Sequence, residues 1–336
     1  MLHHASRALA LPLGLLVPIQ AQKIAPTREV GEHAGAVVAL AWTGEGSALL
    51  TGTEAGELAR WSVADGARVF SRTWRDADGP GSREKDARGA QPAFRIADLD
   101  ALPRSQSYAV IVDPVGWALV DARTGEPVGP PVGINTRMTH VVLDPRGRWL
   151  WAATEGGSIF EYDLSADGTP LVDNADVDGG GINDVATDGK GAHLAIGCAD
   201  STVRLLATSD LESQTRCEGH TAAVTGVAFN AKASILASAS RDETARLWTS
   251  RGRHLRTLMG HESPLTSLAF GKQDKFLATG DEQGKVWVWN VEEFDVVAHA
   301  KLQKGPVRAL AFSPDGKLLA AASGSTSVTL LDLSSW

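Results

Sequence analysis

The chain has 336 residues and a net charge of −8, with 43% hydrophobic residues, 35 glycines and 15 prolines. This is a globular composition, which excludes collagen-like and low-complexity chains. No run of Lys or Arg could follow a phosphate backbone, so we expect no nucleic-acid partner.

The first 22 residues, "MLHHASRALALPLGLLVPIQAQ", differ from the rest of the chain. Arg7 adds positive charge, residues 8–19 are apolar, and Ala21 is a small residue near a cleavage position. This pattern is typical of a secretory signal peptide and is too short to span a bilayer. We therefore expect residues 1–22 to be a signal peptide and the mature protein to be periplasmic or extracellular; without cleavage it would be cytoplasmic. No other stretch is long and apolar enough to span a membrane.

Residues 23–336 repeat a unit of three short segments, each rich in β-branched and aromatic residues. Turn sequences such as "PRGR", "NAKA" and "SPDG" separate the segments, which predicts β-strands. A more polar segment follows four of the units and predicts an outer fourth strand, because a polar edge resists aggregation. The clear units begin at Ala36, Met138, Ile182, Ala223, Pro264 and Pro306, and a weaker one begins at Phe94.

The seventh unit has no fourth strand of its own. Residues 23–30, "KIAPTREV", precede the first unit and lead into "GEH" as "RHLRTLM" leads into "GH". We expect this segment to pair with the last sheet and close the array, which would remove its open edges. The prediction is an all-β single domain of seven four-stranded antiparallel sheets, its ring closed by an N-terminal strand. Residues 74–90 mix both charge signs with Gly and Pro and predict a solvated loop.

One double spacing occurs three times. A histidine precedes a hydroxyl residue by 18 positions and a tryptophan by 28 positions in each copy. The three sets are His33, Thr51 and Trp61; His220, Ser238 and Trp248; and His261, Thr279 and Trp289. The second set also has Asp242 in the turn between its second and third strands.

This pattern resembles the WD-repeat family of β-propellers, whose repeats carry a "GH" pair, an Asp in the second turn and a "WD"-like end to the third strand. The resemblance covers residues 23–336 and implies seven blades. It implies a structural hydrogen-bonded tetrad of His220, Ser238, Asp242 and Trp248, and partial tetrads in the other two sets. The turn Asp is replaced by Ala55 in the first unit and by Gln283 in the sixth. Only the fifth unit is therefore expected to be complete; further departures are Ile134, Tyr162, Gln303 and Leu331.

Ser, His and Asp also form hydrolase triads, so a catalytic interpretation has to be weighed. A hydrolase needs one nucleophile, one base and an oxyanion site, whereas a motif repeated in separate sheets serves the sheets. We expect no catalytic residues, no cofactor and no metal, because the remaining histidines occur singly without zinc-site spacing. These are His140, His193, His254 and His299.

The two cysteines, Cys198 and Cys217, fall on the second and fourth strands of the fourth unit. Strands two apart lie roughly 9 to 10 Å from each other, beyond the roughly 7 Å limit for a disulfide. We therefore expect two free thiols.

The family resemblance places a working surface at the rim where the first strands begin. The mixed charges there suit a protein surface better than phosphate or lipid; the alternative is that most are ordinary solvated loop residues. The candidate residues are Arg137, Thr139, Asn183, Thr225, Arg241, Glu282, Arg308, Glu54 and Glu155.

The favoured function is a non-catalytic scaffold that binds a protein or peptide partner through this rim, as a monomeric propeller within a complex. One alternative is an exported enzyme with a metal or quinone site in the central channel. That would need inward-facing His, Asp or Glu from several units, and the first-strand segments are mostly Ala, Val, Leu, Ser and Thr. A second alternative, a detached sensor piece of a signalling protein, is disfavoured by the leader and the closing strand.

Overall fold

The computed structural model describes residues 21–74, 94–101, 107–133, 136–166, 168, 171–212, 214–271, 274–302 and 305–335. The expected signal peptide up to residue 20, the loop at 75–90, Ile134 and Gln303 lie outside these residues. All regular elements of the described chain are strands, and none of its segments is a helix that could cross a membrane.

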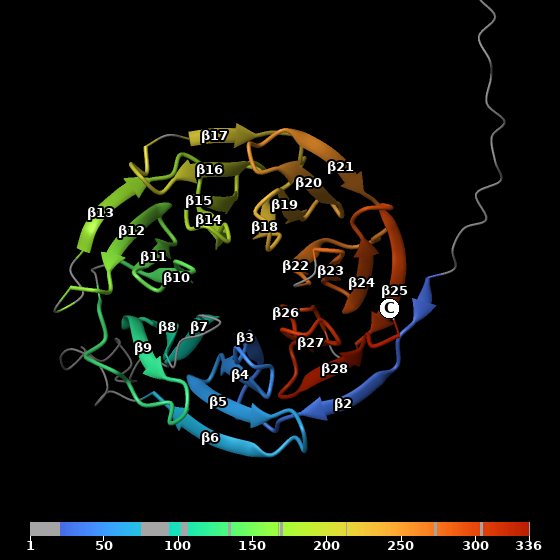
Figure 1. Ribbon diagram of the computed structural model, residues 1–336, viewed down its shortest axis with the longest axis horizontal. Helices are drawn as coiled ribbons and strands as arrows, with labels where there is room; N and C mark the ends of the chain where they lie inside the picture. Colours follow the sequence, from blue (N-terminus) through green and yellow to red (C-terminus); the bar gives the residue numbers. More distant parts are fainter. Residues whose placement is uncertain are drawn as a thin grey trace, which may run out of the picture.

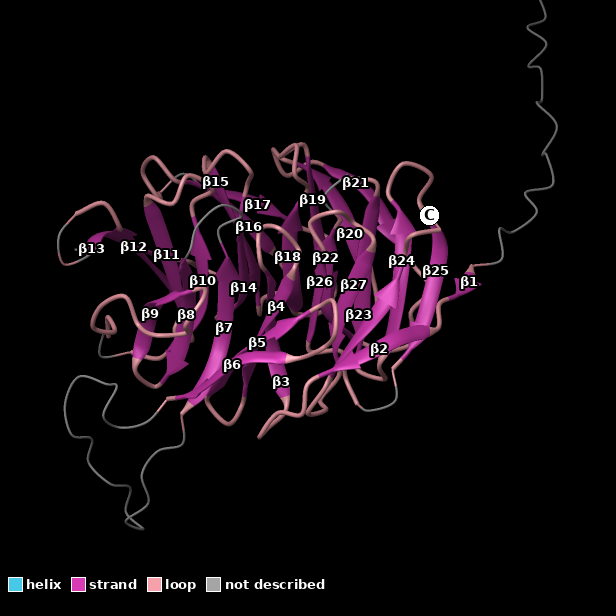
Figure 2. Ribbon diagram, turned by 60° about the horizontal axis from the view of Figure 1, so that its bottom comes forward, coloured by secondary structure: helices cyan, strands magenta, loops and turns pink. Residues whose placement is uncertain are grey.

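Seven sheets stand as blades around a common axis (Figure 1). Within each blade the consecutive strands pair antiparallel, from the first strand beside the axis to the last strand at the outer edge. The tilted view in Figure 2 shows the strands standing side by side through the thickness of the ring. The predicted seven-bladed, all-β fold class is confirmed.

The strand bounds follow the repeated segments closely. The first three blades contain β3 (Val37–Trp42), β4 (Ala48–Thr53), β5 (Glu57–Ser62) and β6 (Arg68–Thr73); β7 (Arg95–Ala101), β8 (Ser107–Asp113) and β9 (Gly116–Asp121); and β10 (Met138–Leu143), β11 (Trp149–Thr154), β12 (Ser158–Asp163) and β13 (Leu171–Asp176). The fourth and fifth contain β14 (Ile182–Thr187), β15 (His193–Cys198), β16 (Val203–Ala207) and β17 (Gln214–Cys217); and β18 (Val224–Phe229), β19 (Ile235–Ser240), β20 (Ala245–Thr249) and β21 (His254–Leu258). The sixth and seventh contain β22 (Leu265–Phe270), β23 (Phe276–Asp281), β24 (Lys285–Asn290) and β25 (Asp295–Lys301); and β26 (Ala309–Phe312), β27 (Leu318–Ala322) and β28 (Val328–Asp332).

Burial falls from the second strand of a blade to the fourth. All six residues of β4 are buried, whereas none of β6 is. The second strand is enclosed by the neighbouring blades on both faces, so its sequence is a continuous run of small and apolar residues. At Gly52 a Cβ would lie 2.9 Å from the Ile96 Cβ of the next blade, and at Gly280 it would lie 2.5 Å from that of Val307. Glycine at these positions permits the close approach of the next blade.

The N-terminal segment closes the ring through two pairings. β2 (Pro26–Val30) pairs antiparallel with β28 and supplies the fourth strand of the seventh blade, as expected. β1 (Gln22–Lys23) pairs parallel with β25, so the sheet of the sixth blade has five strands. Ile24 and Val30 are both buried, each in a different core cluster. The segment thus fastens to two neighbouring blades, one more than the sequence indicated.

The second and third blades differ from the expected strand sets. In the described residues the second blade has three strands, and two isolated bridges, Trp117 to Val132 and Val120 to Pro127, lie along β9 in place of a fourth strand. The third blade has a complete fourth strand, β13, that the sequence did not single out. Its exposed residues include Leu171 and Val172 beside the polar Asp173, Asn174 and Asp176, so this edge is only partly polar.

Cys198 ends β15 and Cys217 ends β17, with β16 between them. These bounds confirm the predicted strand placement, and both thiols are free and buried. Burial raises the pKa of each thiol to about 11. Neither sulfur is therefore a reactive thiolate near neutral pH.

Candidate functional site

Four side chains form one hydrogen-bonded chain across the fifth blade. His220 precedes β18, Ser238 lies on β19, Asp242 lies in the turn after β19, and Trp248 lies on β20. His220 Nδ1 is 2.8 Å from Asp242 Oδ2, and His220 Nε2 is 2.8 Å from Ser238 Oγ. The indole Nε1–H of Trp248 donates to the same Ser238 Oγ at 2.9 Å. The chain joins the loop before the first strand to the third strand.

The order of bonds, carboxylate to imidazole to hydroxyl, is that of a catalytic triad, but the burial is not. Ser238 is 0% exposed and lies under Trp248, so no substrate can reach its hydroxyl. Burial lowers the pKa of His220. Burial opposes ionisation of Asp242, yet hydrogen bonds from Thr244, the Thr221 N–H and His220 lower its pKa overall. A neutral histidine held between a carboxylate and a serine is a stable tie within the sheet.

The sixth blade contains a second complete chain, which corrects the expectation that Gln283 leaves it without an acid. Asp281, the last residue of β23, places Oδ2 2.9 Å from His261 Nδ1. His261 Nε2 lies 2.8 Å from Thr279 Oγ1, which accepts from Trp289 Nε1 at 2.8 Å. The strand end and the following turn lie next to each other, so a carboxylate two residues earlier reaches the same imidazole.

The first blade keeps only half of the chain. Trp61 Nε1 donates to Thr51 Oγ1 at 3.1 Å, but neither ring nitrogen of His33 has a hydrogen-bond partner in the described residues. His33 instead packs edge-on against Trp61 and lies 3.7 Å from Glu57 Oε2. Burial lowers the pKa of His33, against the attraction of Glu57.

The turns between second and third strands are pinned against the starts of the first strands. Backbone N–H groups of Glu54, Glu155, Arg241 and Glu282 each donate to the carbonyl just before the first strand of their own blade, at 2.9 to 3.1 Å. Their side chains are exposed. We call these turns, together with the starts of the first strands, the rim.

Several rim charges pair across neighbouring blades. Arg137 Nη2 lies 2.7 Å from Asp113 Oδ2 of the second blade, and its Nη1 lies 3.4 Å from Glu155. Arg241 of the fifth blade lies 3.4 Å from Glu282 of the sixth. The Arg241–Glu282 pair is exposed and contributes only about 0 to 1 kcal/mol, so it is easily exchanged for other partners, whereas the Asp113 carboxylate held by Arg137 is largely buried.

Three rim candidates lie at β-bulges of the first strands. Asn183 Nδ2 donates to Val224 O, and Thr225 Oγ1 donates to Leu265 O, both at 2.8 Å and both on the next blade. Thr139 Oγ1 donates within its own blade. These half-buried side chains tie strands together and are not free surface groups. Arg308, in the corresponding place of the seventh blade, is exposed.

The repeated chain of His, hydroxyl residue and Trp coincides with matches to family models. The model described as "WD domain, G-beta repeat" matches residues 211–249 and 252–290, which contain both complete chains. These two segments of the seven-bladed propeller are WD repeats. The model described as "Anaphase-promoting complex subunit 4 WD40 domain" matches residues 276–335 of this propeller.

Curated relatives share part of the propeller sequence. Protein FIZZY-RELATED 1 of Arabidopsis thaliana is 31% identical over 139 residues, which cover 41% of this chain and 29% of the relative. Eukaryotic translation initiation factor 3 subunit I of Candida albicans is 36% identical over 104 residues, 31% of this chain and 29% of the relative. Apoptotic protease-activating factor 1 of Rattus norvegicus is 31% identical over 137 residues, 37% of this chain and 11% of the relative. The matched part thus spans less than a third of each relative.

Ionisable side chains lie on first strands of the propeller, among the Ala, Val, Leu, Ser and Thr residues that predominate there. Asp98 and Asp100 lie on β7, His140 on β10 and Asp184 on β14. Each carboxylate accepts from a backbone N–H of the next blade: Asp98 from Val141, Asp100 from Leu143 and Asp184 from Val227. Burial raises the pKa of all three acids, that of Asp184 to about 7. Burial also lowers the pKa of His140 to about 4.

The three carboxylates act as ties between blades. No set of three His, Cys, Asp or Glu side chains within the described residues is arranged to hold a metal ion. The sequence segments "FRIADLD" and "INDVATD" already contain these acidic residues, which interrupt otherwise apolar strands.

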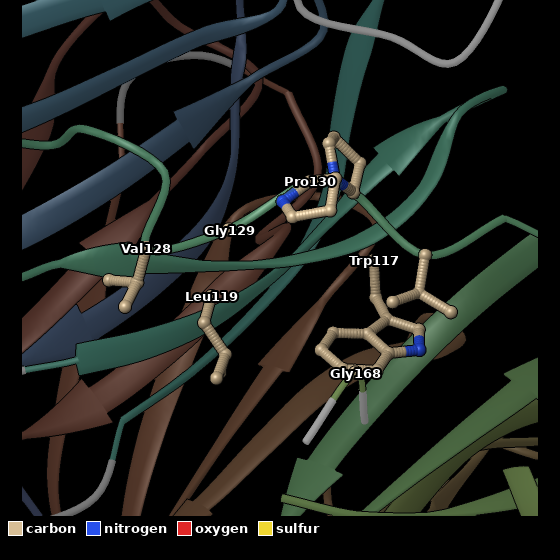
Figure 3. A pocket seen from close by; sticks show the side chains of 8 residues that line it. Trp117, Leu119, Val128, Gly129, Pro130 and Gly168 are labelled. Atoms are coloured by element: carbon tan, nitrogen blue, oxygen red, sulfur yellow. The ribbon is translucent and has the colours of Figure 1, made fainter. Parts of the chain in front are cut away.

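Two hollows lie away from the hydrogen-bonded chains of His, hydroxyl residue and Trp. One, of about 270 Å³, is an apolar groove beside the incomplete edge of the second blade, where Trp117, Leu119 and Val128 lie around Pro130 (Figure 3). The other, of about 510 Å³, lies between the third and fourth blades and is lined by charged and aromatic side chains.

Proposed function

We propose that this propeller is a non-catalytic scaffold that binds a protein or peptide partner through its rim. The observation that carries the proposal is the set of exposed side chains at equivalent positions of four blades, each on a turn fixed by a backbone hydrogen bond. Binding to such a surface costs little free energy for the ordering of loops. Support comes from a relative whose name describes it as one subunit of an initiation factor.

Two rim residues are the most available for a partner. Glu54 and Arg308 are exposed, and neither side chain makes a hydrogen bond or ion pair within the described part of the chain. The exposed pair of Arg241 and Glu282 can exchange partners at small cost. The rim therefore offers both charge signs to a polar protein surface.

Charge reversal tests the rim. The variant Glu54→Arg with Arg308→Glu would be used for affinity capture from the native cell fraction, followed by quantitative mass spectrometry. The matched control, Lys232→Glu with Glu293→Lys, reverses exposed charges in turns at the opposite end of the strands. We expect a protein captured by the wild type and the control to be lost from the rim variant. Equal capture by all three proteins would refute binding through the rim.

Export is part of the same proposal and rests on the apolar N-terminal segment. We expect cleavage after Gln22, the end of the predicted signal peptide, which would leave Lys23, the second residue of β1, as the new terminus. Terminal peptide mass spectrometry of the native protein checks this. An uncleaved Met1 in the cytosolic fraction would contradict it.

A further inference from the structure

The cleft between the third and fourth blades is built from residues that break the pattern of the other blades. Its floor is the face of the third blade carrying Asp144, Trp151 and Glu161, and turns of the fourth blade at Lys190 and Thr208 form the opposite wall. These residues lie at the end of the strands opposite to the rim, so the cleft is separate from the proposed partner surface.

Glu161 stands at a core position. In the sheet register it faces Trp151, and both residues are buried, Glu161 at 7% and Trp151 at 1% exposed. The corresponding pairs in the other blades are Leu50–Arg60, Ala109–Leu119, Ala195–Leu205, Ala237–Leu247, Ala278–Val288 and Ala320–Leu330. Five of these six put Ala against an aliphatic residue where the third blade has Trp against Glu. A carboxylate there costs stability, which is typical of a position kept for function.

Asp144 departs from the pattern in a second way. In other blades the polar residue after the first strand closes its own turn: Thr43, Asp188, Asn230 and Ser313 each accept a hydrogen bond from a nearby backbone N–H. Asp144 is only 3% exposed, yet its side chain makes no hydrogen bond or ion pair within the described residues. Its Oδ1 lies against Gly191 across the cleft, where a Cβ would overlap it.

The aromatic wall already holds one cation. The Arg148 guanidinium lies 4.5 Å from the centre of the Trp149 ring and 3.1 Å from Asp163. Trp149 is half-buried and lines the cleft beside Trp151. This arrangement of an indole face with a nearby carboxylate suits a guanidinium or ammonium group.

We propose that the cleft binds the cationic side chain of an arginine or lysine, with Asp144 and Glu161 as its carboxylate partners and the indoles as its wall. Two buried carboxylates without partners of opposite charge gain most from a desolvated cation. The exposed Arg146 and Lys190 at the mouth carry the opposite sign and meet the carbonyl groups that flank such a side chain in a peptide. The site would accept one basic residue of a protein or peptide, independently of the rim.

The binding test uses short probes that differ only in charge. Nα-acetyl-arginine amide and Nα-acetyl-lysine amide would be titrated against the full chain by calorimetry and by tryptophan fluorescence, with the citrulline amide as the uncharged match for arginine. We expect saturable binding of the basic probes and at least a tenfold weaker affinity for citrulline. Equal binding of citrulline, or binding of a neutral sugar such as cellobiose in place of the basic probes, would overturn the assignment.

Variants at the floor separate a binding role from a structural one. Glu161→Leu puts an aliphatic residue where five other blades have one on the third strand, with Trp151 still opposite it, so we expect a higher melting temperature together with loss of binding. Asp144→Asn should weaken binding about tenfold or more while the protein stays folded. The control Glu262→Gln removes an exposed acid at the other end of the sixth blade and should bind as the wild type does. Unchanged binding in Glu161→Leu, or a destabilised Glu161→Leu, would show that Glu161 does not serve a cation.

Discussion

Replacing Asp281 by alanine tests whether the carboxylate at the end of β23, and not the residue in the following turn, holds His261. Asp281 is 0% exposed and accepts from His261 Nδ1 at 2.9 Å and from the N–H groups of Gln283 and Lys285 at 3.0 and 2.9 Å. Removing one partner of a buried, hydrogen-bonded pair costs about 3 to 5 kcal/mol. For a chain of this size that corresponds to a fall in melting temperature on the order of 5 to 10 °C.

The assay is differential scanning calorimetry of Asp281→Ala beside Gln283→Ala. Gln283 is exposed, so its replacement should change stability by no more than about 0.5 kcal/mol. A second measurement uses pH. Burial disfavours the Asp281 carboxylate, but the hydrogen bonds from His261 and the turn lower its pKa overall. Its stabilising effect is therefore complete above the unfolded pKa, about 3.9, and is lost as pH falls through the lower folded value.

The wild type and Asp281→Ala should thus differ by a constant amount between pH 5 and 8 and converge below about pH 4. Two results would refute the reasoning. One is a loss of stability in Gln283→Ala equal to that in Asp281→Ala. The other is a difference between wild type and Asp281→Ala that does not shrink in acid.

Three further outcomes are expected. Trp248→Ala should lower the melting temperature more than Ser238→Ala, because deleting the buried indole costs about 3 to 5 kcal/mol and losing the hydroxyl about 1 to 3 kcal/mol; calorimetry of both variants gives the order, and the reverse order would contradict it. Deleting residues 22–30 should lower the melting temperature and produce larger species in light scattering, because the edge of β28 is then unpaired; an unchanged monomer would count against ring closure. Asp184, whose pKa burial raises to about 7, keeps a proton in the folded state that the unfolded state loses near pH 4. The free energy of unfolding of the wild type should therefore fall as pH rises from about 4 to about 7. In urea titrations, Asp184→Asn should make this fall about 2 kcal/mol smaller, a value reduced for the partial exposure of the side chain.

The blades could be predicted from the sequence because each one repeats the same short strands and turns. The segment "ALLTGT" became β4 and "FLATGD" became β23 without a shift. The closing role of residues 26–30 followed from a missing fourth strand. The pairing of Gln22 and Lys23 with β25 could not be foreseen, since two residues carry no periodicity.

The sites were predictable only where sequence offset and spatial position agree. The sequence offsets identified the hydrogen-bonded chain of the fifth blade. In the sixth blade, Asp281 reaches His261 from two positions before Gln283, because the end of β23 and the following turn lie next to each other. A bulge shifts the alternation of a strand, so Asn183 and Thr225 point to the next blade and not to solvent. The unusual nature of Glu161 emerges only when seven sheets are aligned by register.

Ring closure by β2 has a consequence for synthesis of the protein. Thr27 and Leu330, which share a hydrogen bond, are 303 residues apart. At about 5 to 20 residues per second, a ribosome needs roughly 15 to 60 s to supply the second after the first. Throughout that time β2 has no partner, and four of its five residues are exposed even in the finished ring, with Pro26 unable to donate to a neighbour. A strand so poor in apolar groups can wait without recruiting other nascent chains, and a truncated product lacking β28 can never complete the circle.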